Sequence, residues 1–105
     1  MSFRWPNKDP DELLDYSIDW SRFIGTATIS SIAWYVEDSA GVKTIIVAGQ
    51  TVNGIQNVSQ TVSGAVATIN LGLGTNNREY KFTCRMTDST GSIAERAVRL
   101  RIKEQ

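Results

Sequence analysis

The clearest strand pattern in the sequence is Glu79-Tyr80-Lys81-Phe82-Thr83-Cys84-Arg85-Met86-Thr87-Asp88, which a turn at 88–91 joins to residues 92–102. Its apolar residues occupy every second position, with charged residues and threonines between them. Because a strand directs alternate side chains to opposite faces, this spacing predicts a strand with one buried face and one solvated face. Residues 92–102 show a similar spacing, so the two segments are predicted to form a β-hairpin.

Earlier parts of the chain show the same rhythm between turn residues, and they predict strands at 14–20, 26–36, 42–48, 55–62 and 65–71. The apolar parity shifts at Ser30-Ser31, which predicts a β-bulge. Turns are expected at 38–41, Asn53-Gly54 and Ser63-Gly64. About seven short antiparallel strands predict an all-β fold, an immunoglobulin-like or fibronectin III-like β-sandwich. Trp34 is the expected core anchor, and Tyr80 lies where a tyrosine corner would form.

A chain of 105 residues has room for one domain, which we place at 9–105 behind an N-terminal arm at 1–8. The arm carries Phe3, Arg4 and Trp5. Its aromatic side chains either fold over the open end of their own sandwich or dock on a partner. The following residues Asp9-Pro10-Asp11-Glu12 predict a single helical turn at most, because strand alternation begins at Leu14.

The composition removes most enzyme chemistry. The chain has no histidine, and so it lacks the commonest general base and most zinc sites. Its one cysteine, Cys84, is expected to be an inert core thiol. The acids Asp9, Asp11, Glu12, Asp15 and Asp19 fit no calcium loop. We therefore predict no catalytic residue, no metal site, no cofactor and no enzyme activity.

The net charge of zero favours neither nucleic acid nor membrane as a partner. We also expect no secretory signal peptide, because Met1 is followed by polar and aromatic residues. The charges are distributed unevenly, with seven acids in the first 38 residues and seven bases from Arg78 onward. Either these segments neighbour each other in one sheet, or the acidic end of one subunit meets the basic edge of another.

The segment Lys8-Asp9-Pro10-Asp11-Glu12-Leu13-Leu14-Asp15-Tyr16-Ser17-Ile18-Asp19-Trp20-Ser21 resembles the opening of fibre–tail adaptors, which are small proteins of tailed bacteriophages. The resemblance continues through Ile32-Ala33-Trp34 and into Thr87-Asp88-Ser89-Thr90-Gly91-Ser92. It is poor between residues 38 and 75. It implies an immunoglobulin-like virion component of the tail region, made in the host cytoplasm, without catalysis or cofactor.

The resemblance implies a structural adaptor, present in several symmetric copies, that connects portal-proximal tail proteins and tail fibres through protein–protein contacts. The candidate docking residues lie near the N-terminus: Phe3, Arg4, Trp5, Asp9, Asp11, Glu12 and Asp15. The alternative is a glycan-binding or decoration module with the same fold. The loops at 38–41, 49–54, 72–77 and 88–91 carry no Trp or Tyr, and this counts against glycan binding.

Overall fold

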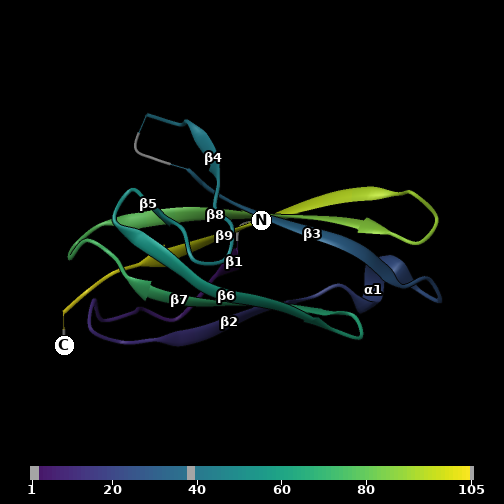
Figure 1. Ribbon diagram of the computed structural model, residues 1–105, viewed down its shortest axis with the longest axis horizontal. Helices are drawn as coiled ribbons and strands as arrows, with labels where there is room; N and C mark the ends of the chain where they lie inside the picture. The colour runs from purple at the N-terminus through teal and green to yellow at the C-terminus, as the bar shows by residue number, and fades with distance from the viewer. Residues whose placement is uncertain (1–2, 38–39, 105) are drawn as a thin grey trace.

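The computed structural model describes residues 3–37 and 40–104 and is built almost entirely of β-strands. Figure 1 shows two layers of strands that run roughly along the long axis of the molecule. The elements are β1 (Phe3–Arg4), β2 (Leu14–Asp19), α1 (Ser21–Ile24), β3 (Ile29–Glu37), β4 (Lys43–Ile45), β5 (Thr51–Val52), β6 (Ile55–Ser63), β7 (Val66–Leu73), β8 (Glu79–Asp88) and β9 (Ile93–Arg101). No helix among these described residues is long and apolar enough to cross a membrane.

One sheet has the order β1-β9-β8-β3-β4 and the other β2-β7-β6-β5. All neighbours are antiparallel except β1, which runs parallel to β9. The predicted final hairpin is confirmed, with nine paired positions from Glu79–Arg101 to Thr87–Ile93. The predicted β-bulge is also confirmed, because the register of β3 against β8 shifts between Ile29 and Ser31.

The inner faces of both sheets share one hydrophobic core. Trp34 and Trp20 are almost completely buried, and Cys84 is a buried free thiol on the inner face of β8. Burial raises the pKa of Cys84 to about 12, which keeps the thiol protonated at neutral pH. The predicted all-β class and buried Trp34 are thus confirmed.

Tyr80 joins the start of β8 to two distant loops. Its hydroxyl accepts a hydrogen bond from the backbone N–H of Thr75 (3.1 Å) and donates one to the carbonyl of Asn53 (2.7 Å). The bond to a backbone group five residues upstream is the kind of contact that defines a tyrosine corner. Asn53 and Gly54 both have positive φ and form the predicted tight turn between β5 and β6.

Two predicted strands differ from the structure. The strand expected at 26–36 begins only at Ile29, because the chain first forms α1, which buries Ile24. The strand expected at 42–48 is reduced to β4, after which a turn at 47–50 leads to the short β5. The turn expected at 38–41 lies partly outside the described residues.

The acidic and basic segments share a sheet only in part. β2, which carries Asp15 and Asp19, belongs to the sheet opposite β8 and β9. The first of the two charge interpretations is therefore wrong for this strand, although Lys81 does pair with Glu37 at 3.7 Å.

Candidate docking surface

Residues 3–8 of the predicted N-terminal arm pack against the body of the protein. β1 aligns Phe3 with Val98 and Arg4 with Arg99. The backbone N–H of Trp5 continues the pairing by donating to the carbonyl of Arg99 (2.9 Å). The side chain of Phe3 lies outside the described part of the structure.

Trp5 packs between the two sheets. Its side chain is 9% exposed and stacks on Tyr16, with 4.7 Å between ring centroids. The rings of Trp34 and Phe82 lie 6.0 and 5.8 Å away. This arrangement corresponds to the first of the two predicted alternatives, in which the aromatic side chain covers its own sandwich.

Lys8 anchors the C-terminal end of the segment 3–8. Its side chain is buried, and the amine donates to the carbonyls of Asp9 (2.8 Å) and Leu73 (2.7 Å). Desolvation lowers the pKa of Lys8, while the negative charges of Glu12 and its neighbours oppose that shift. The amine thus links the N-terminal segment to the end of β7. The structural role of Lys8 was not predicted from the sequence. The only sequence signal for this role is its position beside three acidic residues.

The predicted helical turn is a single turn that displays acids at the surface. Glu12 accepts the backbone N–H of Asp9 (2.9 Å), and Asp9 accepts that of Asp11 (2.8 Å). Asp11 and Glu12 are exposed. Asp15 is exposed on the outer face of β2, where its carboxylate accepts a hydrogen bond from Asn70 (2.8 Å). The reciprocal bonds hold the acidic turn in one conformation.

Leu13 lies between these acids and is 65% exposed. Its side chain covers Gly72 of β7, where a Cβ would lie 2.8 Å from Leu13 Cδ2 and 3.2 Å from Val58 Cγ2. Val58, from β6, is also exposed. Leu13 and Val58 therefore form an apolar spot beside the acidic turn. Sequence reasoning overlooked Leu13, although Leu13 and Leu14 cannot both face inward from one strand.

We call Asp11, Glu12, Leu13, Asp15 and Val58 the acidic-turn surface. Arg4 does not belong to it, since its guanidinium pairs with Glu79 (3.0 Å) alongside β9. Arg99 also pairs with Glu79 (3.1 Å). These hydrogen bonds, the one from Arg4 first, lower the pKa of Glu79. The predicted docking residues therefore separate into a buried tryptophan, an ion-paired arginine and an exposed acidic group.

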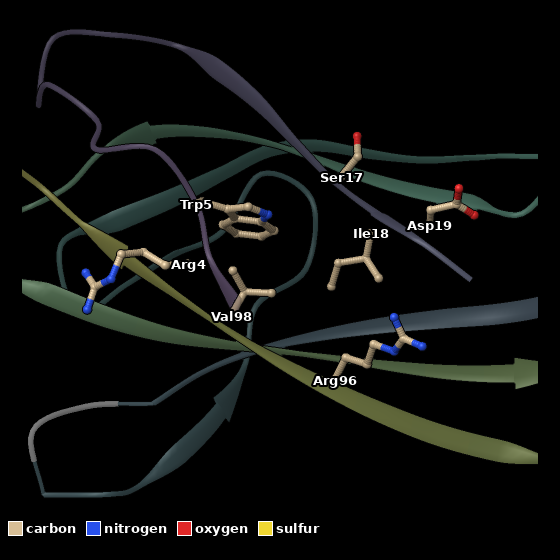
Figure 2. A pocket seen from close by; sticks show the side chains of 7 residues that line it. All are labelled: Arg4, Trp5, Ser17, Ile18, Asp19, Arg96 and Val98. Carbon is tan, nitrogen blue, oxygen red and sulfur yellow. The ribbon is translucent and has the colours of Figure 1, made fainter. Parts of the chain in front are cut away.

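A groove of about 280 Å³ opens between β2 and β9, beyond the end of β1. Figure 2 shows Trp5, Ile18 and Val98 facing one another, with Arg4 at one end and Arg96 and Asp19 at the other. The guanidinium of Arg96 lies 5.1 Å from the ring of Trp20. Hydrogen bonds from Ser21 lower the pKa of exposed Asp19, and Arg22 and Arg96 act in the same direction. The groove is mostly apolar, with charges only at its ends.

Within the described part of the chain, no group of three or more histidine, cysteine or acidic residues could hold a metal ion. The carboxylate of Asp88 instead accepts hydrogen bonds within the turn between β8 and β9. These come from the hydroxyl and N–H of Thr90 and from the N–H of Ser92, and they lower the pKa of Asp88.

Comparison with known protein families identifies the chain. Residues 8–101 fit the sequence pattern of the family described as podophage GP4 fiber-tail adaptor protein gp77. The chain belongs to this family. The match covers nearly the whole chain and confirms the resemblance drawn from Lys8–Ser21 and the final hairpin. No curated protein matches the sequence. The family match begins at Lys8, so β1 and Trp5 lie outside it and the acidic-turn residues lie inside.

Proposed function

We propose that this protein is a structural adaptor of a phage tail, located in the virion and linking portal-proximal tail proteins to tail fibres by protein–protein contacts. Membership of a family of fibre–tail adaptors is the observation that carries this proposal. The absence of histidine and the raised pKa of the single thiol support a role without catalysis. We further propose several symmetric copies per particle, assembly in the host cytoplasm and no contact with nucleic acid or membrane.

The fold proposed for this adaptor is the immunoglobulin-like sandwich. Two features support it: the hydroxyl of Tyr80 bonds to the backbone upstream of its strand, and a buried tryptophan lies on β3. The shared core then holds the two sheets together without a disulfide, because Cys84 is free. A rigid body of this kind suits a protein that transmits load between neighbours rather than changing shape.

The acidic-turn surface is the contact that we propose for a neighbouring tail protein. An exposed leucine surrounded by carboxylates can insert into an apolar pocket, and the carboxylates then meet basic groups on the pocket's rim. The hydrogen bonds of Asp9 with Glu12 and Asp11 already fix this conformation, so little conformational entropy is lost on docking. Trp5 and Lys8 contribute indirectly by holding the chain that leads into the turn.

Particle occupancy tests the role and the surface separately. Leu13→Glu and Asp11→Lys/Asp15→Lys are supplied in trans to a phage lacking the gene, and the protein in purified particles is quantified by mass spectrometry. Ile93→Glu is the matched control, because Ile93 is 55% exposed at the far end of β9. We expect both docking variants to lose about tenfold or more in occupancy, which corresponds to about 1.4 kcal/mol of binding, while the control enters normally.

The outcomes are distinguishable. If the wild-type protein is absent from particles, the adaptor role is refuted. If wild type is present and the two docking variants enter at normal occupancy, the role stands and the acidic-turn surface is refuted. Circular dichroism of each isolated variant verifies that folding is unchanged, as exposure of the substituted side chains predicts.

A further inference from the structure

Strand β6 leaves much of one edge uncovered. On that side β5 pairs only with Ile55 and Gln56. The loop before β5 covers Asn57, whose carbonyl accepts the N–H of Gly49 (2.7 Å) and whose N–H donates to Gln50 (3.0 Å). From 58 to 63, no described residue pairs with this edge, and Figure 1 shows β6 extending well past β5.

The free backbone groups on this edge can be assigned from the hairpin that follows. Ser63 pairs with Val66 across the two-residue turn between β6 and β7. In such a hairpin the closing pair exchanges hydrogen bonds, and alternate residues direct their backbone groups to opposite edges. Ser63 and Thr61 therefore bond toward β7, while Gln60 and Val62 direct their N–H and C=O groups outward.

This edge lacks the protection that most edge strands carry. Charged side chains and prolines usually prevent an exposed strand from pairing with another chain. Here the whole stretch 44–77 contains no Asp, Glu, Lys, Arg or Pro. The register shift between Asn57 and Ser59 lies at the start of the uncovered run, and 59–63 is regular. A hollow of about 180 Å³, lined by Ile32, Gln60, Thr61 and Val62, lies beside it.

We propose that this edge pairs with the same edge of a second copy of the chain, in antiparallel orientation, with Thr61 on the twofold axis. In that register Gln60 lies opposite Val62 of the second copy, and Val62 lies opposite Gln60 of the second copy. The two pairs would exchange about four backbone hydrogen bonds. The four-stranded sheets of the two copies then become one continuous sheet across the axis, an isologous contact.

The side chains favour this register. Thr61 meets Thr61 of the second copy, and Ser59 meets Ser63, so hydroxyl groups face hydroxyl groups across the outer face. Val62 of the second copy comes to lie beside the hollow that Ile32 lines. No like charges are brought together, because the segment has none. A charged strand from another protein would find no opposite charge on this neutral edge. The order of residues is self-complementary, and this favours a second copy.

Five residues per strand make a small contact, so association is expected only at high concentration. Sedimentation equilibrium of the full chain between about 10 μM and about 1 mM should show the mean mass rising from 11.6 kDa toward twice that value. Over the same range, hydrogen exchange of the Gln60 and Val62 amides should slow, because these N–H groups become bonded across the axis.

Substitution at the axis gives the decisive test. Thr61→Lys and Thr61→Glu each place two like charges face to face, and each should weaken association by about tenfold or more. An equimolar mixture of the two variants should associate at least as strongly as wild type, because the introduced lysine then faces the introduced glutamate across the axis. Thr61 is exposed, so both variants are expected to fold.

The matched control is Thr44→Lys, which changes another exposed threonine on the edge strand of the other sheet. We expect it to leave association unchanged. A wild-type chain that stays monomeric to about 1 mM overturns the proposal, as do unaffected Thr61 variants, a mixture that fails to associate, or association lost in Thr44→Lys. These results do not depend on particle occupancy, so the self-contact and the adaptor role fail or stand independently.

Discussion

Trp5→Ala is the perturbation that most clearly distinguishes a docking arm from an integral part of the core. Trp5 is nine-tenths buried and touches the rings of Tyr16, Trp34 and Phe82. Removing a buried tryptophan side chain costs about 3–5 kcal/mol, which is the lost transfer energy plus the cavity that remains. We expect a loss in this range, because three aromatic neighbours cannot all move to fill the space.

Urea unfolding followed by far-ultraviolet circular dichroism measures this loss. With a slope of about 1.5 kcal/mol per molar urea for a domain of this size, the midpoint should fall by about 2–3 M. Phe23→Ala is the control, since Phe23 is an aromatic residue that is 44% exposed. We expect it to cost about 1 kcal/mol or less. A Trp5→Ala midpoint within about 0.3 M of wild type would refute the core assignment and revive the free docking arm.

Three further predictions concern single side chains. Tyr80→Phe removes the hydrogen bonds to the Asn53 carbonyl and from the Thr75 N–H, so it should cost about 1–3 kcal/mol in urea unfolding, whereas Tyr35→Phe should cost little; equal effects would contradict the tyrosine-corner role. Asp88 has a folded-state pKa below its unfolded value of about 3.9, so its contribution to stability is present above that pH and is lost as the pH falls through the folded pKa. Asp88→Asn should therefore flatten the decline of the unfolding midpoint below about pH 4, and an unchanged acid limb would count against this role. Cys84, with a pKa of about 12, should resist a thiol reagent at pH 8 in the native protein and react at once in denaturant, so rapid native labelling would show that the thiol is accessible.

Much of the fold follows from the sequence because strand alternation is a local property. Glu79–Asp88 alternates without interruption, and its pairing with β9 is as predicted. The bulge in β3 was predictable for the same reason. Where the apolar alternation changes from odd to even positions, one extra residue restores a single buried face. Element ends were harder to predict: α1 depends on burial of Ile24, which local spacing does not reveal.

The candidate docking surface was only partly predictable. Acids at Asp11, Glu12 and Asp15 could be assigned to the surface from polarity and alternation. The position of Trp5 could not, because two residues of parallel pairing with β9 produce no periodic signal. The side chain of Leu13 lies over Gly72, a residue nearly sixty positions away. Gly72 leaves room for it because glycine has no side chain. Such contacts depend on the tertiary structure.

We propose that this chain is a passive adaptor that joins a phage tail to its fibres through the acidic-turn surface. Cryo-electron microscopy of purified phage particles can decide this in one experiment. We expect density for this two-layer domain between tail and fibre proteins, with Leu13 and its neighbouring carboxylates against an adjacent subunit. Particles without such density, or a domain whose acidic turn faces open solvent in every copy, would contradict it.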